Sequence, residues 1–185
     1  MARLKFHDGF SRDVLGDWFW EFGSLECEGV RLLKLHGSVT WRRESGGERR
    51  LLKVHPHADR NAAGVLLEPD YEILTGTHNK ILQYARGHFG DLHSLFRASL
   101  RKADCVVVAG FGFRDKAINT MLIEWMEERA RRLVIVHPDP AELRANARPA
   151  VSSAWSRWEV AGKLACVEKR AEDASWRECR DKAVA

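Results

Sequence analysis

One alternation constrains the fold of this chain more than any other feature: two apolar runs enclose a glycine-bearing turn and an amphipathic stretch. The first run, Cys105–Ala109, is apolar throughout, which is typical of a parallel strand buried on both faces. The spacing of apolar residues predicts a helix over 116–132, followed by a strand over 132–136. Asp139-Pro140 then predicts the first turn of another helix. This order indicates right-handed crossovers on a parallel sheet and therefore an α/β fold.

The remaining elements are expected from apolar spacing and from turn residues. Asp91 is expected to cap its helix at the N-terminus, and the sequence specifies the structure of the tail beyond Ala174 only poorly. We expect an amphipathic helix over 14–22, a strand over 30–35, a hairpin over 41–54 that turns at Gly46-Gly47, a short strand over 65–67 ended by Pro69, helices over 77–87, 91–102 and 155–161, and an edge strand over 164–168.

The composition is that of one globular domain. The chain has 185 residues, of which 45% are hydrophobic and 30% charged, so it can bury a core. No apolar stretch approaches the roughly 20 residues that span a bilayer, and the N-terminus has no apolar signal-peptide core. The cysteines form no CxxC pair, which excludes a four-cysteine zinc ribbon; they are Cys27, Cys105, Cys166 and Cys179. We expect a reduced, cytoplasmic protein without a bound metal and without a membrane segment.

The net charge of +4 permits weak attraction to phosphates, but the basic residues are interspersed with acidic ones. We interpret the basic clusters as solvated surface and expect no nucleic-acid partner, because no nucleic-acid recognition fold accompanies them. The histidines lack the spacing of a metal site, and most tryptophans are expected in the core or at its rim.

Two short motifs bear on chemistry. The segment KLHGSVTW, residues 34–41, follows an apolar run and predicts a histidine, His36, at the C-terminal end of a strand, where open α/β sheets bind ligands. The segment GFGFRDKAIN, residues 110–119, follows the strand 105–109 and opens the next helix. Glycines at such a turn let backbone N–H groups approach phosphate or ribose oxygens; alternatively, they serve only a turn that needs a positive φ.

Together these motifs resemble the SIR2-like domain, the bacterial relatives of sirtuins. The resemblance covers residues from about 8 to about 140 and includes Pro69, Tyr71, Lys80 and the segment LVIVHPDP at 133–140. It implies a sirtuin-like, Rossmann-type parallel sheet flanked by helices, with residues 1–185 forming one SIR2-like domain. The family's glycine-rich first turn and its Thr-x-Asn-x-Asp segment have no counterpart here. We therefore expect the C-terminal portion of such a domain, lacking the first glycine-rich βα unit. In isolation it is expected to bind NAD weakly and to hydrolyse it little or not at all.

The resemblance also implies site residues. NAD is the expected substrate, and His36 is expected to act as the catalytic base, because a histidine can deprotonate a water or a ribose hydroxyl near neutral pH. A turn histidine bonded to backbone is the structural alternative. The residues expected to contact the dinucleotide are Gly37, Ser38, Gly110, Phe111, Gly112 and His137, the last through its backbone.

Four neighbouring residues have roles that the sequence leaves open. We expect Asp115 to cap the helix that follows it rather than to take part in catalysis. Arg114 could pair with Asp115 or reach a phosphate. Asn119 could bond to a neighbouring loop or contact the ligand, and Trp41 could form a wall of the nicotinamide pocket.

The resemblance implies an NAD+ hydrolase that releases nicotinamide and ADP-ribose, with a role in bacterial defence against phage. A homo-oligomer or a defence-system partner protein would then be the expected partner. Two alternatives remain: a non-catalytic SIR2-like remnant or partner-binding module, and an NAD-dependent protein deacylase, which the absent zinc ribbon disfavours. Arginine outnumbers lysine, which fits a GC-rich bacterial source.

Overall fold

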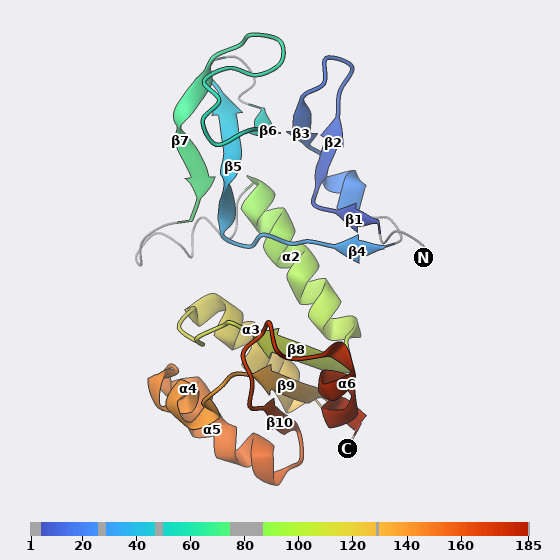
Figure 1. Ribbon diagram of the computed structural model, residues 1–185, viewed down its shortest axis with the longest axis vertical. Coiled ribbons are helices and arrows are strands. Elements are labelled where there is room, and N and C mark those ends of the chain that lie inside the picture. Colours follow the sequence, from blue (N-terminus) through green and yellow to red (C-terminus); the bar gives the residue numbers. More distant parts are fainter. Residues whose placement is uncertain (1–4, 26–28, 47–49, 75–86, 129, 185) are drawn as a thin grey trace. The chain divides into compact units, whose positions relative to one another are not determined.

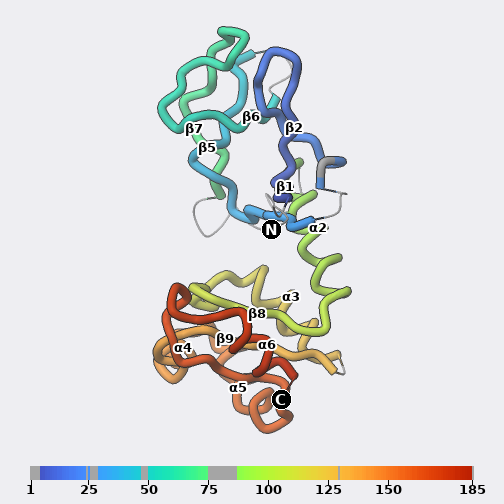
Figure 2. Tube along the Cα trace, turned by 45° about the vertical axis from the view of Figure 1, so that its right-hand side comes forward, coloured from blue at the N-terminus to red at the C-terminus, as the bar shows by residue number. Residues whose placement is uncertain are grey.

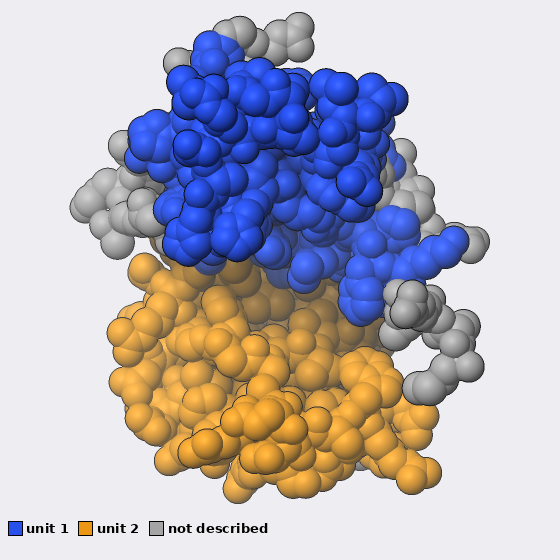
Figure 3. All heavy atoms as spheres, turned by 45° about the horizontal axis from the view of Figure 1, so that its top comes forward, with its two compact units in different colours: residues 1–96 blue, residues 97–185 orange. Residues whose placement is uncertain are grey.

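The computed structural model describes residues 5–25, 29–46, 50–74, 87–128 and 130–184. The chain divides into two compact units, residues 1–96 and residues 97–185 (Figure 3). The boundary falls inside helix α2, Gly87–Lys102. Whether both units belong to one SIR2-like domain over residues 1–185 stays a prediction, and each unit is described by itself below.

The first unit is built on an antiparallel sheet with the strand order β2-β3-β6-β5-β7 (Figure 1). The hairpin predicted over 41–54 is confirmed, because β5 and β6 pair antiparallel with Trp41 opposite Lys53. A short parallel pair, β1 with β4, and a 3-10 helix, η1, accompany the sheet. The bounds are β1 Phe6–His7, β2 Phe10–Arg12, β3 Trp18–Trp20, η1 Phe22–Leu25, β4 Val30–Arg31, β5 Gly37–Glu44, β6 Leu51–Lys53 and β7 Leu67–Ile73.

The helix predicted over 14–22 is wrong, because this segment forms a β-hairpin between β2 and β3. Asp13 accepts hydrogen bonds from the backbone of Leu15 (3.0 Å) and Asp17 (2.9 Å), which closes a turn. Gly16 has φ +98°, a left-handed conformation that ends any helix there. The helical spacing of the aromatic residues was a coincidence of two short strands and a turn.

Two predicted strands have different bounds. The strand predicted over 30–35 is limited to β4, Val30–Arg31, and it is followed by irregular backbone. Pro69 does not end a strand: β7 continues through it from Leu67 to Ile73. Strand β7 lies at the edge of its sheet, where the missing N–H of proline leaves no partner unsatisfied.

The core of the first unit is aromatic and aliphatic. Trp41 is 1% exposed and packs against Phe10 (5.2 Å between ring centroids) and Trp20 (6.0 Å). Leu33 and Leu35, which the sequence suggested as strand residues, pack against this cluster from irregular backbone. The buried members are Phe10, Leu25, Trp41, Leu51, Leu74, Phe89 and Leu92.

Helix α2 begins at Gly87, four residues before the start predicted from Asp91. The reason is that His88 and Phe89 are themselves buried, so the apolar face starts earlier than the leucines suggest. Asp91 therefore lies within the helix and does not cap it. The helix predicted over 77–87 lies outside the described residues except for Gly87.

The second unit is a parallel sheet with the strand order β10-β9-β8, as the alternation predicted. Strands β8, Cys105–Ala109, and β9, Arg132–Val136, have the predicted bounds, and β10, Leu164–Val167, is the predicted edge strand. The tail beyond Ala174, which the sequence specified poorly, contains a helix, α6. Its cap is reciprocal: the Ser175 hydroxyl accepts from the Glu178 N–H (3.2 Å), and Glu178 accepts from the Ser175 N–H (2.9 Å).

Helices cover the parallel sheet on two faces (Figure 1; Figure 2). Residues on one face, Val134, Val136 and Val167, form a cluster with Cys179 of α6. Alternate residues of β9 point to the opposite face, on the side of α5, which contacts β10 and α3. The bounds are α3 Lys116–Glu127, α4 Pro140–Asn146, α5 Pro149–Val160 and α6 Trp176–Val184. None of the helices in the described part of the chain is long and apolar enough to cross a membrane.

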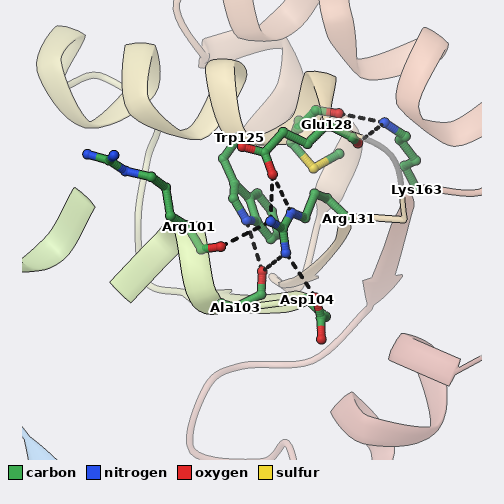
Figure 4. A network of polar contacts seen from close by, with 8 residues as sticks. Arg101, Ala103, Asp104, Trp125, Glu128, Arg131 and Lys163 are labelled. Carbon is green, nitrogen blue, oxygen red and sulfur yellow. Dashed lines mark hydrogen bonds and ion pairs between the residues drawn. The ribbon is translucent and has the colours of Figure 1, made fainter. Parts of the chain in front are cut away.

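A polar network fixes the place where β8 begins (Figure 4). The guanidinium of Arg131 donates to the carbonyls of Arg101 (3.0 Å) and Ala103 (2.7 Å) and to Asp104 Oδ1 (2.9 Å). Trp125 Nε1 donates to the same Ala103 carbonyl (3.0 Å). Helix α3 thus ends at Glu127 rather than at the predicted residue 132, because the chain leaves the helix to place Arg131 in this network.

Candidate functional site

His36 is held in a turn whose backbone is fixed on both sides. The Gly37 N–H donates to the Lys34 carbonyl (2.9 Å), and the Leu74 N–H donates to the His36 carbonyl (3.0 Å). The side chain is half-buried. His36 precedes β5 of an antiparallel sheet, so its predicted position at the C-terminal end of a strand is wrong. The physical reason is that residues 32–36 form no strand.

Gly37 is required by the backbone itself. Its φ is +81°, and a Cβ at this position would lie 1.9 Å from the carbonyl oxygen of Glu72 on β7. The close approach therefore occurs between two strands of the same sheet. A contact between Gly37 and a dinucleotide stays a prediction.

Ser38 and Trp41 follow on β5 with different surroundings. The Ser38 hydroxyl lies 3.1 Å from Lys34 Nζ and 2.9 Å from Thr40 Oγ1, so it belongs to a small polar group next to the His36 turn. Trp41 lies in the hydrophobic core. The suggestion that Trp41 forms a wall of a nicotinamide pocket is therefore wrong, because its indole is 1% exposed.

A charged cluster joins β5, β7 and α2 near this turn. Arg43 Nε donates to Glu72 Oε1 (2.5 Å), and Arg43 Nη2 lies 3.3 Å from His88 Nδ1. Burial, and then the charge of Arg43, lower the pKa of His88 to about 4. The Glu72 carboxylate lies 3.6 Å from His88 Nε2, but it does not reverse this shift. His88 is therefore neutral at pH 7.

The second motif forms the turn between β8 and α3, and its backbone is unusual. Gly110 has φ +67°, and Phe113, a fully buried residue, has φ +51°. Two donors hold the Phe113 carbonyl: Asn119 Nδ2 at 2.7 Å and the Arg148 N–H at 3.1 Å. Of the two roles left open for Asn119, the structure shows the bond to a neighbouring loop.

The space beside the two glycines is open. A Cβ built on Gly110 or Gly112 would meet no heavy atom within 4 Å. Phe111, between them, is half-buried and lies edge-on to the ring of Phe113, with 5.1 Å between the ring centroids. The turn thus leaves room for a ligand next to its backbone.

The N-terminus of α3 is already occupied. Asp115 Oδ1 accepts hydrogen bonds from the N–H groups of Ala117 (2.9 Å) and Ile118 (3.0 Å), which confirms the predicted cap. These are the N–H groups that would otherwise face an anion at the helix end. A phosphate at this turn would therefore bind the backbone of residues 110–113 rather than the end of the helix.

His137 follows β9 at the same edge of the sheet. Ala109 is the register partner of Val136, so Gly110 and His137 are the next residues of two neighbouring parallel strands. The His137 N–H donates to the Val167 carbonyl (3.1 Å), and His137 Nδ1 accepts from the Asp139 N–H (3.0 Å). Since its N–H is used, the predicted backbone contact would have to come from the His137 carbonyl.

The predicted site residues fall into two groups, one in each compact unit. Gly110, Phe111, Gly112 and His137 share the carboxyl edge of one sheet, in residues 97–185, whereas His36, Gly37 and Ser38 belong to residues 1–96. Across the described ranges, no group of three or more His, Cys, Asp or Glu side chains could hold a metal ion.

Arg148 is a residue at this turn that the sequence did not suggest. Besides its backbone bond to Phe113, its Nε donates to the Arg114 carbonyl (2.5 Å). A signal was present: Arg148 precedes Pro149 at the start of α5, in a position where Ser, Thr, Asp or Asn is preferred. Within the described residues no acidic group pairs with Arg114, and Asp115 serves as the cap.

A parallel sheet with an open glycine turn at its carboxyl edge has the geometry at which α/β folds bind ligands, and the same chain carries a His-Gly turn. Sequence comparison agrees: residues 11–160 match the SIR2-like domain. The chain therefore belongs to the SIR2-like family, as the two motifs predicted, and the match spans both compact units. A search of curated proteins finds no match to this chain.

Proposed function

We propose that this protein binds NAD+ and hydrolyses it to nicotinamide and ADP-ribose, with His36 as the general base. The observation that carries the proposal is the turn at residues 34–37. Backbone hydrogen bonds on both sides of His36 fix the backbone from which its imidazole extends. Cleavage of the bond between nicotinamide and ribose needs a group that takes a proton from the attacking water or from a ribose hydroxyl. A histidine is suited to this at neutral pH.

The binding half of the proposal rests on residues 97–185. The open backbone at Gly110–Gly112 and the carbonyl of His137 lie at the edge where parallel sheets bind nucleotides. Because Asp115 occupies the N-terminus of α3, the dinucleotide would be held by turn backbone. Gly37 and Ser38 would contact it next to His36.

In a protein that also carries the family's glycine-rich first unit, we expect His36→Ala to reduce nicotinamide release by at least about 10²-fold, the lower range for a lost general base. Nicotinamide release from NAD+ is measured by chromatography. A separate titration measures the binding of NAD+. His57→Ala is the control, because His57 is exposed and is bonded to His55 through its own backbone N–H. Unchanged turnover in a folded His36→Ala protein would contradict the role of His36.

A second function is favoured by one observation. The capped end of α3 removes a phosphate site that many dinucleotide-binding folds use. This fits a SIR2-like module that binds a nucleotide or a partner protein without cleaving it. Saturable NAD+ binding by the wild-type chain without any nicotinamide release would favour this function over hydrolysis.

We also propose that NAD+ cleavage serves bacterial defence against phage, as the resemblance to SIR2-like proteins implies. Depletion of NAD+ would halt phage replication together with the metabolism of the infected cell. The experiment compares plaque formation and cellular NAD+ in infected bacteria that express the wild-type chain or His36→Ala. Equal plaque counts in the two strains would contradict this role.

A further inference from the structure

A small groove lies beside the turn that follows Gly112. It has a volume of about 390 Å³ and belongs wholly to residues 97–185. Two arginines line it from different elements: Arg114 from the turn before α3, and Arg148 from the residue before α5. The other lining residues are Ala145, Asn146, Ala147 and Pro149.

The lining of this groove is basic and carries no carboxylate. Three other grooves of the same unit each carry at least two acidic residues, so their cations are balanced locally. These acidic residues are Glu168, Glu178 and Asp181 in one, Asp139, Glu159 and Glu168 in another, and Glu124 and Glu128 in the third. The groove at Arg114 and Arg148 therefore favours an anion.

Neither guanidinium has an acidic partner among the described residues, and both arginines are exposed. This distinguishes them from Arg131 and Arg157, which form ion pairs with Glu128 and Glu127. Arg148 is nevertheless held in place, because its Nε donates to the Arg114 carbonyl. Its position as the N-cap of α5, with no side-chain cap, adds the positive end of that helix to the same region.

We propose that Arg114 and Arg148 form a binding site for a phosphate group. Guanidinium groups bind phosphate oxygens in a bidentate geometry, and two of them at one groove provide both charge and direction. The phosphate has two possible sources: the pyrophosphate of the dinucleotide bound at the neighbouring Gly110–Gly112 turn, or a separate phosphorylated effector. Only the first source rests on the proposed function.

The test uses inorganic pyrophosphate and isothermal titration calorimetry on the wild-type chain and on Arg114→Gln. We expect the variant to bind pyrophosphate about fivefold more weakly, as for one lost charge-assisted contact at an exposed site. The Arg114 side chain makes no hydrogen bond within the described residues, so this change should not disturb folding. The matched control is Arg177→Gln, which removes an exposed arginine from α6, outside the groove.

Competition distinguishes the two sources. If NAD+ displaces pyrophosphate, and if the affinity for NAD+ falls by the same factor in Arg114→Gln, the groove binds the substrate's own pyrophosphate. If NAD+ binds both proteins equally and does not displace pyrophosphate, the groove binds a separate effector. Equal pyrophosphate affinity in the wild type and Arg114→Gln, or an equal loss in Arg177→Gln, would overturn the proposal. These titrations need no turnover, so they remain interpretable in a chain that releases no nicotinamide.

Discussion

At the scale of single residues, the two motifs owe their glycines to different causes. Gly37 is needed because the Glu72 carbonyl occupies the place of a side chain, whereas Gly112 has no positive φ and no close neighbour. At the His-Gly turn, any side chain larger than that of glycine would clash with the neighbouring strand. At the second turn, the space beside the glycine backbone is open. The sequence showed the glycines of both motifs but could not separate these causes.

Gly37→Ala is expected to destabilise the protein by more than about 3 kcal/mol, because left-handed strain adds to a backbone clash. Gly64→Ala is the matched control: its φ is also +81°, but nothing lies within 4 Å of the added Cβ. The control should lose only about 1 kcal/mol from strain. Urea unfolding measures both values, and equal losses would show that the clash at Glu72 relaxes without effect.

The residue identities of the site were predictable where a motif carried them, and not where the contact was made by distant chain. His36 and Gly110 were found from their motifs. Arg148 reaches the turn from 34 residues beyond Arg114, through hydrogen bonds to the carbonyls of Phe113 and Arg114. No local pattern encodes such a contact, because it depends on how α4 and α5 return to the sheet.

At the scale of elements, the parallel half of the fold was predicted well and the antiparallel half poorly. Strand β8 is apolar throughout, and β9 is apolar and buried from Leu133 to Val136, so a continuous apolar run of this length favours a strand of a parallel sheet. The strands β2 and β3 have three residues each, and their aromatic spacing fits a helix equally well. Only the left-handed Gly16 and the Asp13 turn decide between the two.

Asn119 links α3 to the turn before it, and its loss should weaken that connection. We expect Asn119→Ala to reduce the free energy of unfolding by about 1 kcal/mol, because the buried bond from Nδ2 to the Phe113 carbonyl is lost. Thr120→Ala on the same helix removes an exposed bond to the Lys116 carbonyl and should change stability by less than about 0.5 kcal/mol. Chemical unfolding followed by circular dichroism compares the two, and indistinguishable values would argue against a fixing role for Asn119.

At the scale of the whole molecule, acid should weaken residues 1–96 selectively. The unfolded imidazole of His88 has the ordinary pKa of 6.5, while burial and Arg43 lower the folded pKa to about 4. The unfolded state therefore binds more protons between these values, so the stability present above pH 6.5 is lost as the pH falls toward 4. Glu72, which faces the same ring, opposes the effect only in part.

The measurement is the midpoint of urea unfolding at pH 7 and at pH 5. NMR signals assigned to each unit report the unfolding of that unit. The urea midpoint reported by signals from β5 and β6 should be lower at pH 5 than at pH 7. His88→Gln should reduce this difference. His57→Gln, a change at an exposed histidine, should retain it. A wild-type pH dependence that persists in His88→Gln would show that another group is responsible.

The position of His88 also has an optical consequence. Its ring centroid lies 5.9 Å from that of Trp41 and 6.1 Å from that of Trp20, and His88 and Trp41 are both buried. A protonated imidazole quenches indole fluorescence at such range, whereas a neutral one does so weakly. The fluorescence of these two tryptophans should therefore fall when His88 becomes protonated, so it reports the charge on His88 without an added label.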